Sequence, residues 1–207
     1  PTGLKYPLAG MNFTKFALLF ILCLWTSHLF AQTVSDQLLQ FNQQNIDHQR
    51  TAMLALGGWA VANIGIGLGF SQSTTGETKY FHQMNALWNT VNLAIAGIGY
   101  WSISGTDPAS WDLATGLSKH QSFQKILLFN AGLDVGYIVG GFYLQERARR
   151  LDVNSDRLRG FGKAIVLQGS FLMAFDLINY FIANGRTGDL DLRLGAVGNG
   201  VGMVLTF

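Results

Sequence analysis

The sequence predicts an all-α membrane protein, a four-transmembrane-helix bundle followed by a short C-terminal β-hairpin or tail. Three observations lead to this prediction. Only 13% of the 207 residues are charged and 49% are apolar, a balance unusually poor in charge for a soluble domain. Four apolar stretches have the length needed to cross a bilayer. The arginines are concentrated in the loop after the third of these stretches.

The N-terminal region has the features of a targeting segment. Residues 1–10 are interpreted as a fragment or a misplaced start, because Met11 opens a better beginning. In residues 11–31, Lys15 is followed by an apolar run, as in a secretory signal peptide, and cleavage is expected after Ala31. An uncleaved anchor is the alternative, since a leucine rather than a small residue stands two positions before that point.

The transmembrane domain is predicted to cover residues 51–185. A polar, amphipathic segment, residues 32–50, precedes it on the periplasmic side, and a periplasmic tail, residues 186–207, follows it. Within the domain, stretches of membrane-spanning length predict helices at residues 51–70, 84–103, 126–144 and 164–183.

The distribution of arginine predicts the orientation. Residues 145–160, after the third span, are rich in arginine, and the positive-inside rule places such a loop in the cytoplasm. A secretory signal independently places residue 32 onward outside the cytoplasm, and three crossings then bring the same loop inside. The sequence therefore predicts a multi-pass protein of the bacterial inner (cytoplasmic) membrane with both ends in the periplasm.

A faint internal repeat predicts that the bundle consists of two tandem helical hairpins. Residues 58–64 align without gaps with residues 132–138, and Gly67 then aligns with Gly141. The second halves also align, with Leu87 over Leu167, Ala94 over Ala174, Ile98 over Ile178 and Tyr100 over Tyr180. Matches of small and aliphatic residues are common in membrane helices, so duplication and chance similarity are both open at this point.

The C-terminal residues follow a different pattern. Polar and apolar residues alternate from Asp189 to Leu194, and Gly198-Asn199-Gly200 separates two apolar runs. This pattern predicts a β-hairpin. A short interfacial helix or a flexible tail is the alternative.

Polar residues recur at helical spacing on the predicted spans. Asn63, Asn92, Asp134 and Asp176 each fall within one helical turn, about 5 Å, of the estimated bilayer centre. An ionised acid at this depth costs roughly 3 kcal/mol on insertion scales, and no lysine or arginine lies there. We expect the acids to face the bundle interior, with at least one of them protonated. The candidate ligand-binding residues are Asp134, Asp176, Asn63, Asn92, Asn89, Asn130, Tyr137 and Gln168.

Two classes of function fit this polar core. Since an intramembrane acid is a functional candidate, the leading hypothesis is a non-enzymatic bundle that binds a small ligand, a proton or cation, or a lipid. The alternative is a structural or assembly subunit of a membrane complex, whose polar core only fixes helix packing. A third alternative is an intramembrane enzyme that uses the two acids.

The sequence contains no enzyme motif of the HExxH, GxSxG, P-loop or CxxC type. Its four histidines are scattered, and its only cysteine, Cys23, lies in the predicted signal peptide. We therefore expect no catalytic residue, no metal and no cofactor. A basic face with a nucleic-acid-binding motif is also absent. The expected partners are membrane lipid, a small ligand, proton or cation, and other membrane subunits or a second copy of the chain.

The polar residues also form a pattern that resembles a known family. The residues concerned are Asn45…Arg50…Trp59-Ala60…Asn63, Met84-Asn85…Trp88-Asn89…Asn92, Asn130…Asp134…Tyr137 and Gln168…Phe175-Asp176…Tyr180. In them the chain resembles an uncharacterised family of small four-helix bacterial membrane proteins, of the domain-of-unknown-function type and associated with the Bacteroidota. The resemblance covers roughly residues 38–185. It implies the four-helix topology and supplies no activity.

Overall fold

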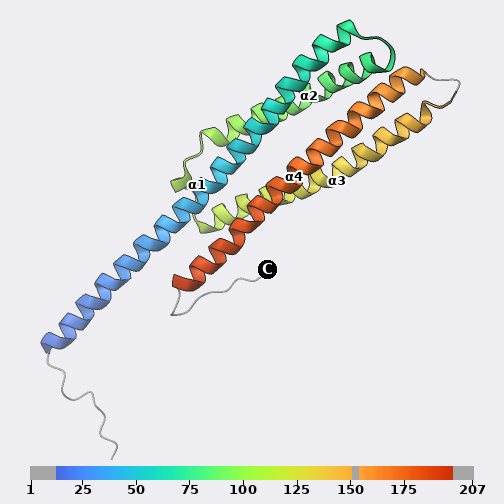
Figure 1. Cartoon of the computed structure of the whole chain (residues 1–207). Helices are drawn as coiled ribbons and strands as arrows, with labels where there is room; N and C mark the ends of the chain where they lie inside the picture. Colours follow the sequence, from blue (N-terminus) through green and yellow to red (C-terminus); the bar gives the residue numbers. More distant parts are fainter. Residues whose placement is uncertain (1–12, 151–153, 198–207) are drawn as a thin grey trace, which may run out of the picture.

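Four long helices and one short 3₁₀ helix make up the part of the chain that the structure describes (Figure 1). The computed structural model describes residues 13–150 and 154–197, and these ranges contain no strand. In chain order the elements are α1 (Phe13–Ser73), α2 (Gly76–Ser104), η1 (Pro108–Ser110), α3 (Leu113–Arg147) and α4 (Ser155–Val197). The predicted all-helical fold is confirmed.

α1 contains residues 13–31 of the predicted signal peptide and the predicted amphipathic segment, residues 32–50, in one unbroken helix. Phe41 and Ile46 of the amphipathic segment are buried, which identifies the face that this segment turns toward the bundle. Cleavage after Ala31 stays a prediction, and the proposed misplaced start, residues 1–10, lies outside the described residues.

The prediction of a C-terminal β-hairpin is wrong for the residues up to Val197, which the structure describes. α4 continues to Val197, so the alternating segment that begins at Asp189 is helical. The expected turn at Gly198-Asn199-Gly200 lies outside the described residues. Adding residues to a long existing helix is easy because the nucleus has already formed, whereas an isolated two-stranded hairpin is marginally stable in water.

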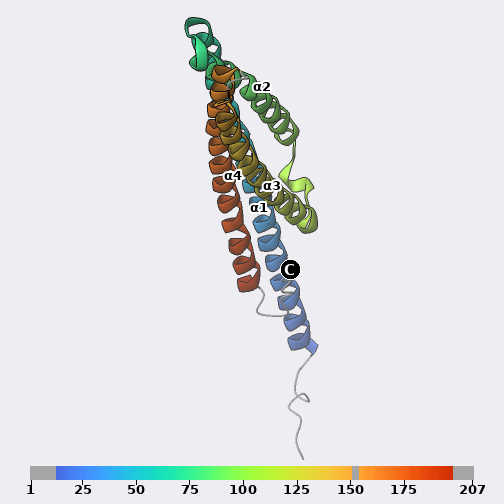
Figure 2. The same ribbon diagram turned by 90° about the vertical axis from the view of Figure 1, so that its right-hand side faces the viewer.

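The helices pack as two hairpins. α1 lies along α2, α3 lies along α4, and the hairpins meet mainly through α2 and α4. The backbones of α2 and α3 stay further apart, since no Cα atom of α2 comes within 8 Å of one in α3. Figure 2 shows that α1 and α4 extend well beyond α2 at the end opposite the α1–α2 turn.

The turn within the first hairpin is shorter than the predicted loop. Only Thr74 and Thr75 separate α1 from α2, whereas the first two predicted spans end at residue 70 and begin again at residue 84. Gly76 opens α2 with a φ of 58°, a left-handed conformation that glycine adopts at little cost. Next to this turn, Lys163 of α4 contacts Glu77 with an Nζ–Oε1 distance of 2.5 Å, which joins the two hairpins at this end.

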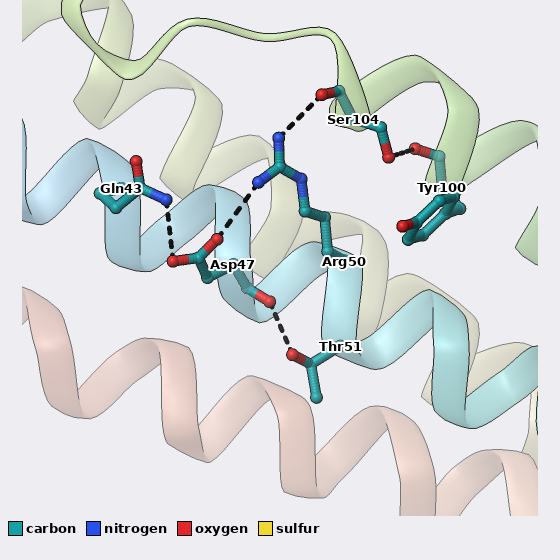
Figure 3. Close-up of polar contacts among 6 residues, drawn as sticks. All are labelled: Gln43, Asp47, Arg50, Thr51, Tyr100 and Ser104. Atoms are coloured by element: carbon teal, nitrogen blue, oxygen red, sulfur yellow. Dashed lines mark hydrogen bonds and ion pairs between the residues drawn. The ribbon is translucent and has the colours of Figure 1, made fainter.

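The opposite end of the first hairpin is joined through Arg50 (Figure 3). Its Nη2 donates a hydrogen bond of 2.8 Å to the backbone oxygen of Ser104, the last residue of α2, and its Nη1 lies 3.3 Å from Asp47 Oδ1. The last carbonyls of a helix have no partner within the helix, and a cation there also interacts favourably with the helix dipole. Arg50 of α1 therefore stabilises the end of α2.

Both hairpins use a glycine at equivalent places to bring their helices together. A Cβ atom built on Gly67 of α1 would lie 2.7 Å from the backbone oxygen of His82 in α2. One built on Gly141 of α3 would lie 2.7 Å from the backbone oxygen of Gly162 in α4. The predicted repeat places Gly67 over Gly141, and the register of its second half places His82 over Gly162. Each hairpin therefore has a close glycine contact at the equivalent position, in addition to the similar sequence pattern.

The bundle is polar inside and apolar outside. The buried polar side chains come from all four long helices: Asn42, Asn45, His48, Asn63, Asn85, Asn89, Asn92, His120, Asp134, Gln168, Asp176 and Asn179. Large apolar side chains instead cover the outer faces, and alanine is the commonest buried apolar residue among those described. A water-soluble bundle buries its large apolar residues, so this distribution indicates an apolar solvent.

Three helical segments, Ser35–Ser73, Leu113–Arg147 and Ser155–Thr187, are long and apolar enough to cross a membrane. α2 does not reach the same mean hydropathy because it carries Asn85, Asn89 and Asn92. These three side chains are buried in the bundle, so they do not reduce the apolar character of its outer face.

The glycine contacts predict the effect of added methyl groups. Gly67→Ala and Gly141→Ala should each destabilise the fold, since overpacking costs about 1–3 kcal/mol, which outweighs the ~1 kcal/mol that alanine gains over glycine in a helix. Gly65→Ala and Gly140→Ala are matched controls, because a Cβ at either position meets nothing within 4 Å. Thermal unfolding in detergent measures the difference. Equal melting temperatures for all four variants would contradict the close packing.

Candidate functional site

Four interior residues form a closed ring of hydrogen bonds that joins α1, α2 and α4. Trp59 Nε1 donates to Gln168 Oε1 (2.9 Å), and Gln168 Nε2 donates to Asn85 Oδ1. Asn85 Nδ2 donates to Asn63 Oδ1 (2.7 Å), and Asn63 Nδ2 closes the ring on the backbone oxygen of Trp59 (2.8 Å). The side-chain amides of Asn63 and Gln168, two predicted ligand-binding residues, are therefore engaged in helix packing.

Asn89 and Asn92 extend this ring along α2. Asn89 Nδ2 donates to the backbone oxygen of Asn85 (2.8 Å), and Asn92 Nδ2 donates to Asn89 Oδ1 (3.2 Å). Asn89 is fully buried, and both of its hydrogen bonds lie within α2. Asn92 differs, because it also borders a cavity.

A cavity of about 150 Å³ lies among the four helices, on the side where α2 and α3 stay apart. Five of the eight predicted ligand-binding residues line it: Asn92, Asn130, Asp134, Tyr137 and Asp176. The rest of its wall is aliphatic or aromatic, and no lysine or arginine is among its lining residues. The structure thus divides the predicted set into a hydrogen-bond ring and a cavity lining.

The two acids line the same cavity. Asp134 is 2% exposed and Asp176 is 6% exposed, and their carboxyl groups are close enough to hydrogen-bond to each other. Oδ2 of Asp134 is buried and accepts no hydrogen bond from an N–H or hydroxyl group of the described residues. Apart from a proton shared with Asp176, this oxygen therefore has no donor, and the pair has room for a donor from a ligand.

Aromatic rings bound the cavity. Trp88 of α2 meets Tyr137 of α3 edge to face, with ring centroids 4.9 Å apart, and this contact bridges the gap between the two helices. Phe175 of α4 lines another part of the wall. Edge-to-face aromatic pairs contribute about 0.5–1.5 kcal/mol beyond their buried area, so the Trp88–Tyr137 contact stabilises the position of α3.

A second polar cluster, which the sequence patterns did not reveal, lies near the end of the bundle opposite the α1–α2 turn. Arg186 Nη1 of α4 lies 2.9 Å from His48 Nδ1 of α1, and His48 Nε2 lies 2.8 Å from Asn179 Oδ1. Because an arginine can only donate, His48 Nδ1 accepts and Nε2 carries the hydrogen. His48 is therefore held as a neutral imidazole.

His120 of α3 completes this histidine cluster. Its Nδ1 lies 2.8 Å from Asn45 Oδ1 of α1, and its Nε2 lies 2.9 Å from Thr187 Oγ1 of α4. The two histidines treated as scattered in the sequence thus occupy one region and link three helices. Within the described part of the chain, no group of three or more His, Cys, Asp or Glu residues could hold a metal ion.

The polar interior, the apolar exterior and the three helices of membrane-spanning length define a helical bundle with the characteristics of a membrane protein. A family model described as "Family of unknown function (DUF6992)" matches residues 55–177, more than half of the chain, and the chain belongs to this family. The resemblance to an uncharacterised family is confirmed, while its association with the Bacteroidota stays a prediction. No curated protein and no solved structure matches the chain.

The hydrogen-bond ring predicts that Gln168→Leu destabilises the protein by about 1–3 kcal/mol, the cost of leaving buried polar groups without partners. The groups affected are Trp59 Nε1 and Asn85 Oδ1. Thr90→Val is the control, since the Thr90 hydroxyl is on the outer face of α2 and bonds only to backbone of its own helix. Thermal unfolding measures the loss of stability in each variant. A loss for Gln168→Leu no greater than that for Thr90→Val would show that the ring does not hold the helices together.

Proposed function

We propose that this protein is an integral protein of the bacterial inner membrane that binds a proton or a small cationic ligand at the Asp134–Asp176 pair. The observation that carries the proposal is an incompletely hydrogen-bonded pair of buried acids beside a cavity. Two adjacent carboxyl groups without a cation cannot both be ionised at low cost. The pair therefore holds at least one proton and gains a favourable partner when a cation arrives.

Within this proposal the remaining residues have different roles. Asn92, Asn130 and Tyr137 line the cavity and supply neutral polar groups around a ligand. Asn63 and Gln168 position the helices through the ring, and Asn89 bonds to Asn85 and Asn92 within α2. That ring also supports the second candidate function, a structural or assembly subunit of a membrane complex, because its hydrogen bonds join three helices.

The membrane topology is part of the proposal. All four long helices cross the bilayer, including α2, whose outer face carries the exposed side chains of Leu87, Val91, Ile95 and Ile98. Residues 71–80 and 145–160 are cytoplasmic, which is consistent with the arginine-rich loop and with the Lys163–Glu77 contact that brings both hairpin turns to one end. Residues 104–121 and 186–207 are periplasmic, and membrane lipid surrounds the apolar faces.

Cysteine labelling tests this topology. In a Cys23→Ser background, single cysteines at Thr74 and Arg149 should be protected from an impermeant thiol reagent in intact spheroplasts, because their loops are cytoplasmic. A cysteine at Asp107 should react under the same conditions. Labelling at Arg149 without permeabilisation would overturn the orientation.

The acid pair is tested with Asp134→Asn and Asp176→Asn. Asparagine nearly preserves volume and hydrogen bonding but cannot ionise, so the fold should survive with a change on the scale of one interhelical bond, ~0.6 kcal/mol. Methylammonium, a small cation, should raise the melting temperature of the purified protein, and both variants should lose this response. Asp36→Asn, which removes an exposed carboxyl elsewhere on α1, is the control. An unchanged response in the double variant would leave the structural-subunit function.

A further inference from the structure

The cavity at the acid pair opens on the outer, apolar face of the bundle. Its lining includes Val91 and Ile95 of α2 and Leu133 and Tyr137 of α3. These side chains are also 60%, 52%, 42% and 38% exposed, respectively, so they form a rim between cavity and surroundings. The rim lies where the backbones of α2 and α3 stay apart, beside the Trp88–Tyr137 contact and at the depth of the predicted spans. A ligand reaches this opening from the hydrocarbon of the bilayer.

Hydrogen-bonded side chains flank the cavity along the axis of the bundle. Along α4, Gln168 of the ring comes first, Asp176 of the cavity follows, and Asn179 of the histidine cluster comes next. The ring therefore lies on the side of the α1–α2 turn, and the His48–Asn179 contact lies on the other side. Between these two contacts, the exposed rim between α2 and α3 gives a route to the acids.

The charge and hydrogen bonding of the site favour a cationic head group on the ligand. Oδ2 of Asp134 accepts no hydrogen bond from the described residues, and the cavity lining includes no cationic side chain. A cation that carries hydrogen-bond donors supplies both a donor to this oxygen and a positive charge beside the acids. An anion is instead repelled by an ionised carboxylate. The titratable groups that line the cavity are Asp134, Asp176 and Tyr137.

The apolar and aromatic wall of the cavity favours an apolar group on the rest of the ligand. Leu56, Leu172 and Phe175 give it apolar surface, and Trp88 and Tyr137 present aromatic rings. Aromatic rings also attract a cation that lies within about 6 Å of a ring centroid. The volume of about 150 Å³ equals that of an engineered apolar cavity that holds benzene. The free space therefore fits a single small ring or an aliphatic group of similar size.

We propose that this site binds a lipophilic monocation, an amine with a benzene-sized apolar group, with its ammonium at the Asp134–Asp176 pair and its apolar group in the opening between α2 and α3. The inference rests on the proposed function and adds the ligand class and the position of the tail. When the pair holds two protons, binding of the ammonium releases one of them, so that the charge of the site is unchanged. A pair that already carries one negative charge binds the ammonium without proton release.

Three probes test the ligand class on the purified full-length protein by thermal shift. Benzylammonium has the ring and the charge, methylammonium has the charge alone, and benzyl alcohol has the ring alone. Benzylammonium should bind at least roughly tenfold more tightly than methylammonium, since it adds the burial of one aromatic ring. Benzyl alcohol, which has the ring without the charge, should give no shift that depends on Asp176, as judged with Asp176→Asn. Equal affinities for the two ammonium ions would overturn this inference and leave the proposed cation site standing. No shift with either ammonium ion would overturn both.

A pair of tryptophan substitutions tests the position of the tail. Ile95→Trp should fill the opening and abolish the advantage of benzylammonium over methylammonium, while methylammonium still binds. Ile98→Trp is the control, because Ile98 is 69% exposed on the same helix and does not line the cavity. Leu133→Trp fills the opening from α3 and replaces Ile95→Trp if that variant does not fold. An unchanged advantage in both rim variants would show that the tail lies elsewhere.

Discussion

The hydrogen-bond ring of Trp59, Gln168, Asn85 and Asn63 fixes how α1, α2 and α4 lie against one another. Lipid offers no hydrogen-bond partner, so each polar group in such an interior has to find one within the protein. A ring in which every donor finds an acceptor meets this requirement only at one register of the three helices. α3 contributes no residue to the ring. The polar side chains that α3 turns inward are consequently free to border the cavity.

Much of the fold follows from patterns along the chain. Apolar runs of membrane-spanning length predicted the long helices, and glycines at equivalent positions predicted the two hairpins. Helical spacing also placed Asn92, Asp134 and Asp176 on interior faces, which burial confirms. The spacing does not tell which interior residue meets which, because partners depend on the order of helices around the axis. The division of the polar residues between ring and cavity was therefore visible only in three dimensions.

The errors have related physical causes. Alternation from Asp189 to Leu194 spans only a few residues, and the helix that precedes it determines their conformation. The histidine cluster was missed because His48 and His120 are distant in sequence and belong to different helices. Asn45 and His48 do share one face of α1 by their spacing, which was the available signal. Their partners on α3 and α4 could not be read from that face.

The helices differ in length, and this difference divides the molecule into a part with all four long helices and a part where only α1, α3 and α4 continue. Ser35–Ser73 contains 39 residues, about 58 Å of helix, whereas the hydrocarbon core of a bilayer is about 30 Å thick. α2 is shorter and ends near Arg50, while α1, α3 and α4 continue past it together (Figure 2). In the proposed topology, this continuation stands above the hydrocarbon as a three-helix subdomain at the headgroup and water level. His48 and His120 are buried within it, next to Arg186, so the proposed topology gives the protein an extramembrane part built from the same helices that carry the acids below.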